Sequence, residues 1–227
     1  RDTITDRGSA RGQAARRGLE LTASVAAEDC GPILAKPPWT PLPANAIPRL
    51  AMSDLSLTIL PESANDAQAI ERLHERTFGP GRYALSAYRL REHVDHRLDL
   101  SFTARIGTLL VGSVRQLPIC IGDTPALLLG PLTVEPPFRS RGVGRALLDR
   151  ALKDARAKGH TLVVLVGDEA YYSRVGFKMI PKGRTDMPGP VDHRRLLVAE
   201  LVEGAFDNVS GPIRPDWAFA REILKSR

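Results

Sequence analysis

The sequence predicts an α+β (mixed α/β) fold, with a mostly antiparallel sheet, one central parallel strand pair and helices on the flanks. Two observations predict it. Between residues 98 and 134, apolar segments of strand length follow one another with only short turns between them, as in antiparallel pairs. A single amphipathic helix then joins the last of these segments to another apolar one. Those two strands run parallel if the connection is the usual right-handed crossover.

The elements before this sheet are expected to be one strand and two helices. Residues 55–60 have the alternation of a strand. Ser63 has the side chain of a helix N-cap, and apolar residues follow it at helical spacing over 64–77. Gly79-Pro80-Gly81 ends that helix, and residues 83–93 predict a second, shorter one.

Three strands follow without an intervening helix. Residues 98–105 and 109–114 predict an antiparallel pair, and the second strand can continue beyond this range. A turn at 122–125 leads into the central strand, whose three successive leucines at 127–129 suit a strand covered on both faces. The prolines at 136–137 cannot donate to a β-ladder, so the strand has to end before them.

The rest of the chain predicts a helix, two strands and a C-terminal tail. The helix at 142–158 is apolar on one side and charged on the other, and Gly159 is a natural C′ residue. Residues 161–166 predict a second fully buried strand, and 196–202 the last major strand. A helix over 215–225 is expected to pack back through three apolar side chains, Trp217, Phe219 and Ile223.

Composition and charge limit the class of protein. The 227 residues, 43% hydrophobic and 26% charged, are ordinary for a soluble globular protein. No run of about 18 apolar residues is present, so we expect neither a transmembrane helix nor a membrane partner. Cys30 and Cys120 lie far apart and form no metal pattern, which favours free thiols in a reducing, cytoplasmic compartment. The net charge of +6 favours polyanionic partners without distinguishing nucleic acid from a nucleotide cofactor.

The first 52 residues differ from the rest. Prolines are dense at 36–43, and the apolar content is too low to offset the entropy of ordering the chain. We expect residues 1–52 to be a disordered N-terminal extension and residues 53–227 to form the domain with its tail. Because Met52 begins the recognisable domain, we hypothesise that it is the natural start.

The stretch after the central strand has the residues of an anion site. Residues 139–145 (RSRGVGR) lead into a helix whose first-turn N–H groups have no partner within the helix. The positive end of the helix dipole, small residues and three arginines favour a pyrophosphate. Two better-known phosphate loops do not fit. A dinucleotide fingerprint needs glycine in place of Leu147, and a P-loop needs Gly-Lys-Ser/Thr in place of Gly144-Arg145-Ala146.

What the loop does match is Arg/Gln-x-x-Gly-x-Gly/Ala, carried by Arg139, Gly142 and Gly144. This resembles the acyl-CoA pyrophosphate loop of the GNAT N-acetyltransferase superfamily. A second motif agrees with it, because Tyr172 stands four residues before Gly176-Phe177 and so resembles the family's Tyr-x-x-x-Gly-Phe signature. The chain is similar in both motifs to bacterial predicted acetyltransferases.

The resemblance implies a GNAT-like acyl-CoA N-acyltransferase fold, in which the sheet splays apart at the central parallel pair, and acetyl-CoA as cosubstrate. Pantetheine amides would bond to the strand edge at the backbones of Leu132 and Val134. The implied reaction is direct attack of a substrate amine on the thioester, with Tyr172 protonating the departing thiolate. The implied pyrophosphate contacts are Arg139, Ser140, Arg141, Gly142, Val143, Gly144 and Arg145.

The acceptor side is less defined. The early helical region of this family usually lines the acceptor site, which implies contacts from four residues, Phe78, Tyr83, Tyr88 and Arg89. A lysine amine has a pKa near ~10.4, so a base or a water chain is needed at neutral pH. Glu135, Asp168 and Glu169 stand near the ends of the two central strands, and spacing does not choose among them. The amine can belong to a small molecule or a protein, and the sequence leaves monomer and homodimer open.

Two alternatives come from other classes of protein. A noncatalytic acyl-CoA-binding regulatory module would keep the loop without acceptor chemistry. A nucleic-acid binder is suggested by the sequence pI of about 9.7. No basic–aromatic array or helix-turn-helix pattern supports specific nucleic-acid binding, so we expect none. His93 and His96 have no further ligand cluster beside them, and we expect no metal.

Overall fold

The computed structural model describes residues 56–81, 86–92 and 94–219. All of them belong to one unit of the chain, Leu50–Arg227. The expectations for residues 1–52, Cys30, Tyr83, His93 and Ile223 lie outside the described residues.

The described chain folds into a mixed sheet of nine strands. Four strands form an antiparallel meander in chain order: β1 (Leu57–Pro61), β2 (Phe102–Ile106), β3 (Leu109–Ile121) and β4 (Thr124–Val134). Across the sheet, β4 pairs in parallel with β5 (Leu162–Val166), which pairs antiparallel with β8 (Leu196–Glu200), and β8 with β6 (Lys178–Met179). The expected fold class, mostly antiparallel with a central parallel pair, is confirmed.

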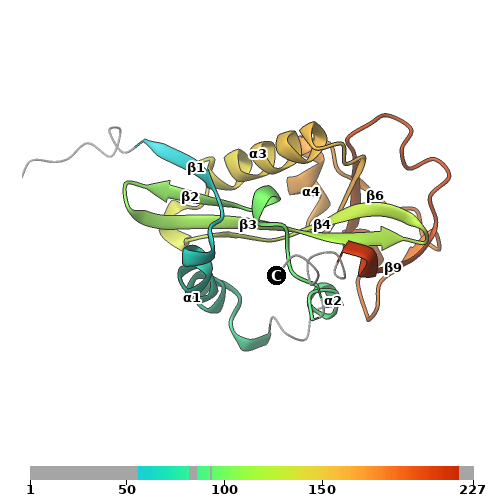
Figure 1. Ribbon diagram of the computed structural model, residues 1–227, viewed down its shortest axis with the longest axis horizontal. Helices are drawn as coiled ribbons and strands as arrows, with labels where there is room; N and C mark the ends of the chain where they lie inside the picture. Colours follow the sequence, from blue (N-terminus) through green and yellow to red (C-terminus); the bar gives the residue numbers. More distant parts are fainter. Residues whose placement is uncertain (1–55, 82–85, 93, 220–227) are drawn as a thin grey trace, which may run out of the picture. The chain divides into compact units, whose positions relative to one another are not determined.

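Layers on both sides bury the central strands, because α3 (Val143–Ala157) lies on one face of the sheet while α1 (Ala67–Phe78) and α2 (Ser86–Arg89) lie on the other (Figure 1). Successive β4 side chains point to opposite layers. Leu127 packs in the cluster that contains Leu147 of α3, whereas Leu128 packs with Leu90 at the end of α2. Burial of this strand on both faces is therefore confirmed.

Local signals set the helix boundaries. The carboxylate of Asp66 accepts hydrogen bonds from the backbone N–H and the hydroxyl of Ser63, both at 2.8 Å, at the start of the helical region that becomes α1. Gly79, with φ +65°, ends α1. Gly159, with φ +83°, follows α3 and donates to the carbonyl of Arg156 at 3.0 Å, as expected for a C′ residue.

Some expectations for strands and the tail are wrong. Leu98–Leu100 is a 3₁₀ turn rather than the start of β2, because the N–H of Leu100 donates to the carbonyl of Arg97. The strand at 196–202 is followed by another, β9 (Gly211–Pro215), which pairs with the end of β3 and with β7 (Thr185–Asp186). Trp217, expected to pack on the domain, is 46% exposed, whereas Phe219 is partly buried.

The described residues contain neither a membrane-spanning helix nor a cluster of metal-binding side chains. No described helix is long and apolar enough to cross a membrane. Nor do three or more His, Cys, Asp or Glu side chains gather into a metal-binding group in this part of the chain. Cys120 is a free thiol in β3, as expected, and burial raises its pKa.

Candidate active site

The central parallel pair separates after a short contact. Only Leu127 with Val163 and Leu128 with Val164 are in register between β4 and β5. Beyond them β4 continues to Val134, paired with β3 on its other side. Among the described residues this part of β4 therefore has no strand neighbour on the β5 side, which is the splay that the family resemblance implied.

A bulge marks the point of separation. The register between β3 and β4 steps from Gln116–Leu129 to Val114–Leu132. Gly130 and Pro131 of β4 thus stand opposite the single residue Arg115, and such an insertion bends a strand and turns its edge. Gly130 has φ +128°, a conformation that favours glycine.

The backbones of Leu132 and Val134 face the open edge. The N–H of Glu135 donates to the carbonyl of Val111 at 2.9 Å, so Glu135 faces β3. Residues that face the partner strand alternate along an antiparallel ladder. Leu132 and Val134 therefore face away from β3, as their assignment to pantetheine requires. The carbonyl of Val134 is already occupied, because Arg139 Nε donates to it at 3.2 Å.

The loop before α3 exposes backbone donors. Its N-cap, Gly142, has φ +83° and no side chain caps the helix. The hydrogen bond from Ala146 N to Gly142 O, 2.9 Å long, is the first of the helix, so the N–H groups of Val143, Gly144 and Arg145 precede it. Together with the positive end of the dipole, these donors can hold an anion.

The three loop arginines are held in different ways. Arg139 folds back onto the end of β4, as above. Arg145 binds the carboxylate of Asp149 through Nε at 2.8 Å and donates through Nη1 to the carbonyl of Arg174 at 3.2 Å. The guanidinium of Arg141 lies 6.0 Å from the ring centroid of Phe138. Arg139 and Arg145 thus fix the loop against its neighbours, and their charge surrounds the start of the helix.

A cavity of about 520 Å³ opens where β4 and β5 separate. It is lined by the β4 bulge, the end of β5, the short helix α4 (Glu169–Tyr172), the α1–α2 region and the loop before β8. Five residues named from the sequence line it: Phe78, Tyr88, Leu132, Asp168 and Tyr172. Polar and charged lining residues that the sequence reasoning did not assign to the site include Arg91, Asp192 and Arg195.

Tyr172 is half-buried in this cavity. Its ring makes edge contacts with Phe177, 5.8 Å between centroids, and with Tyr171, 4.9 Å. Burial raises the pKa of Tyr172 to about 12; the neighbouring Tyr171 adds to the rise and Arg195 opposes it. The hydroxyl therefore keeps its proton throughout the neutral range and is a hydrogen-bond donor to whatever enters the cavity.

Tyr171 reaches the start of α3. A Cβ built on Gly144 would lie 2.6 Å from the Tyr171 hydroxyl oxygen. Glycine at this position therefore lets Tyr171 lie against the first turn of α3. The Tyr171 side chain thus packs against this turn, and it is also 41% exposed.

Of the three carboxylates named as candidate bases, only Asp168 lines the cavity. Its Oδ1 accepts from the N–H of Ala170 at 3.1 Å and caps α4. Glu135 binds Arg76 Nε at 3.1 Å, and Glu169 is exposed outside the cavity. Asp192, which sequence reasoning missed, also lines the cavity but binds Arg194 at 3.0 Å.

The arginine of the α2 region that lines the cavity is Arg91 rather than Arg89. Arg89 is exposed, and its Nη1 donates to the carbonyl of Pro188 at 2.9 Å. Arg89 is the last residue of α2 and Arg91 follows it by two positions, and a four-residue helix is too short to show a periodic pattern. No signal in the sequence separates them.

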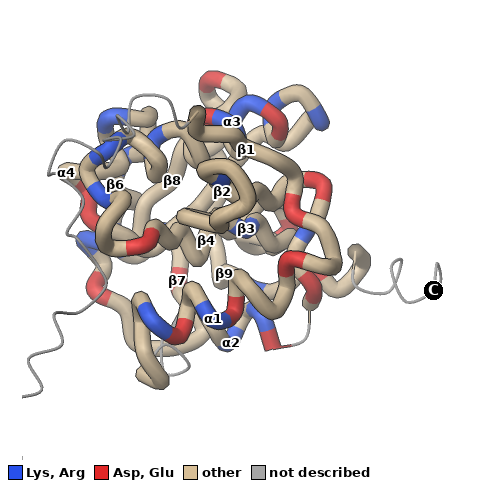
Figure 2. Tube along the Cα trace, turned by 90° about the vertical axis from the view of Figure 1, so that its left-hand side faces the viewer, with Lys and Arg blue, Asp and Glu red and all other residues tan. Residues whose placement is uncertain are grey.

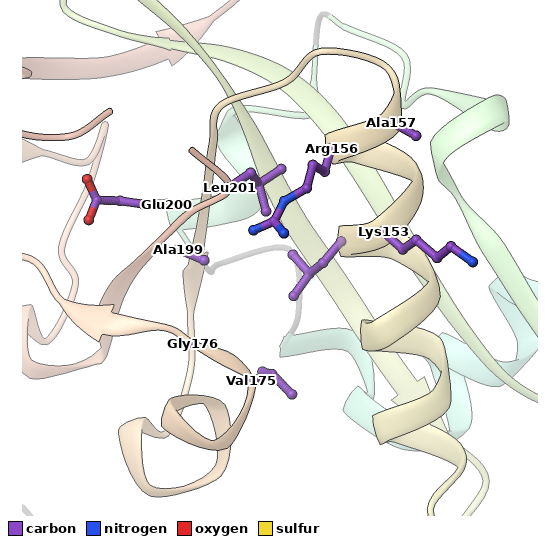
Figure 3. Close-up of a pocket in the computed structure, with 9 residues that line it drawn as sticks. Lys153, Arg156, Ala157, Val175, Gly176, Ala199, Glu200 and Leu201 are labelled. Atoms are coloured by element: carbon purple, nitrogen blue, oxygen red, sulfur yellow. The ribbon is translucent and has the colours of Figure 1, made fainter. Parts of the chain in front are cut away.

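A second hollow, of about 530 Å³, lies between α3 and β8 (Figure 3). Arg156 extends across it toward Leu201, while Lys153 points away to the other side of α3. It shares no lining residue with the cavity at the splayed strands. The hollow is therefore separate from the site that contains Tyr172.

Charges of both signs alternate along α3 (Figure 2). Arg145 pairs with Asp149 and Arg150 with Asp154, each one turn apart. This mixed pattern differs from the single-sign stripe typical of nucleic-acid-binding surfaces.

Comparison with known proteins gives the same family as the motifs. An Acetyltransferase (GNAT) domain model matches residues 99–179, a range that contains both motifs. The chain is 29% identical over 148 residues to YhbS of Escherichia coli K12, named an uncharacterized N-acetyltransferase, covering 64% of this chain and 88% of YhbS. It is 27% identical over 157 residues to YjhQ of the same strain, another uncharacterized N-acetyltransferase, covering 66% of this chain and 87% of YjhQ. The crystal structure of E. coli YhbS in complex with CoA superposes with a TM-score of 0.62 at 26% identity, covering 73% of this chain and 92% of YhbS.

Proposed function

Because this chain belongs to the GNAT acetyltransferase superfamily, we propose that it transfers the acetyl group of acetyl-CoA to a primary amine. The observation that carries this proposal is the open edge of β4, which leads from the cavity around Tyr172 to the uncapped start of α3. The similarity to YhbS, whose structure contains CoA, supports it. The acetyltransferase domain proposed here occupies residues 53–227.

Acetyl-CoA would lie along this edge. The amides of the pantetheine arm would bond to Leu132 and to the N–H of Val134, as an added strand bonds to a sheet edge. The pyrophosphate would accept from the N–H groups of Val143, Gly144 and Arg145. Ser140 and Gly142 give the loop its shape, since both have positive φ.

The reaction forms a C–N bond to the thioester carbonyl carbon and breaks the C–S bond. The amine loses one proton, and the CoA thiolate gains one. Asp168 is the carboxylate that we assign to remove the amine's proton, directly or through a water, because it is the candidate that lines the cavity.

We place Tyr172 at the leaving sulfur of CoA. A thiol has a pKa near ~8.5, well below the value of about 12 for Tyr172, so the tyrosine keeps its proton while negative charge develops on the sulfur. We assign Tyr172 to donate a hydrogen bond from its hydroxyl to that sulfur, and the proton that the departing thiolate takes up comes from solvent. The hydrogen bond stabilises the leaving thiolate in the transition state, where it contributes to rate.

A screen of acetyl-CoA against amines tests the proposal. The purified protein is mixed with acetyl-CoA and with small amines, aminoglycosides, amino acids and peptides, and the released CoA thiol is measured. We expect amine-dependent release with at least one class. Binding of acetyl-CoA without amine-dependent release across the panel would instead indicate the noncatalytic acyl-CoA-binding module.

A further inference from the structure

Arg91 lies in the cavity beside the bulge of β4. A Cβ built on Gly130 would stand 3.5 Å from Arg91 Nη2, so the guanidinium lies close to the point where the central strands separate. The N–H of Arg91 donates to the carbonyl of Tyr88 at 2.8 Å, and the ring centroid of Tyr88 lies 5.2 Å from its guanidinium carbon. The first contact fixes the backbone of Arg91, and the second places its guanidinium beside the ring of Tyr88.

The guanidinium has no anionic partner in the described part of the chain. Arg91 Nε is buried and makes no hydrogen bond there. The two carboxylates that line the same cavity are engaged elsewhere, Asp168 with the start of α4 and Asp192 with Arg194. Arg115, the other cation that acts on Arg91, is itself paired with Glu62 at 2.6 Å.

Burial without a counter-charge disfavours the charged guanidinium. It lowers the pKa of Arg91 to about 10; Tyr88 opposes the change and Arg115 adds to it. Arg91 stays cationic at neutral pH. Arg91 is partly buried, with its Nε shielded from solvent and unpaired, so a bound anion would stabilise the charged guanidinium.

We propose, resting on the acetyl transfer above, that the acceptor is a small amine that carries a carboxylate, an amino acid or close analogue, and that Arg91 binds this carboxylate. The planar guanidinium matches a carboxylate through two parallel hydrogen bonds. The cavity volume of about 520 Å³ lies in the range of small-molecule sites. The side chain of a protein lysine carries no carboxylate of its own.

We assign the anionic groups of CoA to a different part of the fold. None of the loop residues 139–145 lines the cavity that contains Arg91. The start of α3 supplies the donors for the pyrophosphate, and Arg91 comes from the opposite layer of the fold, after α2. Arg91 and the loop therefore serve two separate anions.

An equilibrium measurement tests Arg91 without requiring turnover. The full chain, saturated with CoA, is titrated calorimetrically with a panel of N-acetylated amino acids and with their matching carboxamides. The wild type is expected to bind the best carboxylate about 10- to 100-fold more tightly than its carboxamide, the usual range for hydrogen bonds to charged groups. Arg91→Met should abolish this preference, and Arg91→Lys should keep part of it because the charge remains while the fork is lost.

A kinetic experiment compares free amino acids with their carboxamides as acceptors. Because the amines of the two compounds ionise differently, the rates are measured over a range of pH. Arg91→Met should remove the preference for the carboxylate mainly through a higher KM. Arg72→Met, the same change on an exposed residue of α1, is the matched control and should leave the preference intact. Thermal unfolding of each variant shows whether it is folded. If Arg91→Met does not fold, the assignment is tested by the preference of the wild type for carboxylates and by the reduction of that preference in Arg91→Lys.

The two proposals fail in different ways. Equal binding of carboxylates and carboxamides by the wild type, or an undiminished preference in folded Arg91→Met, would overturn the assignment of Arg91 even if acetyl transfer is observed. A carboxylate preference that depends on Arg91, together with no transfer to any amine, would sustain the carboxylate site and reject the transferase.

Discussion

The ring of Tyr172 lies against the backbone of Gly167, where an added Cβ would come within 2.3 Å of Tyr172 Cε2 and 2.9 Å of Leu165 Cδ1. Gly167 directly follows β5, and its N–H donates to the carbonyl of Arg195 at 2.8 Å. The end of the parallel strand thus sets the position of the tyrosine in the cavity. A methyl group at this position has to displace the ring.

Gly167→Ala should therefore reduce turnover without removing a catalytic group. We expect a loss of stability of about 1–3 kcal/mol from overpacking and a fall in kcat, with the affinity for acetyl-CoA nearly unchanged. Gly81→Ala is the control, since a Cβ there meets nothing within 4 Å. Steady-state kinetics and urea unfolding measure the two effects. Unchanged kcat in Gly167→Ala would show that the ring position does not matter.

Tyr172→Phe removes only the hydroxyl. We expect turnover to fall by roughly 10²-fold or more while the Kd for acetyl-CoA stays close to that of the wild type, because the donor acts on the leaving sulfur. Tyr171→Phe, the adjacent and more exposed ring, should keep most activity. The rates must be measured where chemistry limits turnover. Near wild-type rates under those conditions would exclude Tyr172 from the chemistry.

Gly142→Ala tests the anion loop. The added methyl meets nothing within 4 Å, but φ of +83° is strained for alanine by about 1–2 kcal/mol, so the loop should relax and its N–H groups turn. We expect acetyl-CoA to bind roughly 10-fold more weakly, which corresponds to about 1.4 kcal/mol. Gly183→Ala, with φ +81° and equally open space outside the loop, carries the same strain. Equal losses of affinity in both variants would mean that the effect is not specific to the loop.

His74 predicts a dependence of stability on pH. Its ring is buried and lies 3.3 Å from the hydroxyl of Ser113. Burial, with Arg115 next, lowers the pKa of His74 to about 4, against an ordinary value of ~6.5. Because the unfolded chain takes up the proton first, stability is full above the ordinary value and is lost as the pH falls from there toward 4.

The matching variant is His74→Gln, which keeps a polar contact to Ser113. Between about pH 7.5 and about pH 5, the wild type should lose about 2 kcal/mol more of its free energy of unfolding than the variant does. Urea unfolding at the two pH values measures it, and carboxylates that titrate in both proteins cancel in the difference. Parallel pH profiles would show that His74 is not the group responsible.

The sequence predicted the strand, turn and helix that frame the proposed donor site because the signals for these elements are local. The apolar run at Leu127–Leu129, the prolines at 136–137 and the glycine at 142 each fix a strand, a stop or a turn within a few residues. The open edge at Leu132 and Val134 came from the family resemblance, since periodicity cannot show where two parallel strands separate.

The lining of the cavity was predicted less completely because it depends on contacts far apart in sequence. Arg91 meets the bulge at Gly130 across the sheet, and Arg89 instead holds the loop at Pro188. The loop residues at 190–195 reach the cavity only because β8 pairs beside β5. In the same way, β9 was missed because its prolines at 212 and 215 are typical of turns, while its partners lie in β3 and β7.

The central claim is that the acetyl group of acetyl-CoA reaches an amine at the splayed strands. The most direct measurement uses acetyl-CoA labelled with ¹³C in the acetyl group and follows the label and the free CoA by mass spectrometry. We predict that label appears on the amine nitrogen in equal amount to the CoA released, and that both fall together in Tyr172→Phe. CoA released with the label found only in free acetate, or label on the amine at the same rate in the absence of the protein, would contradict the account.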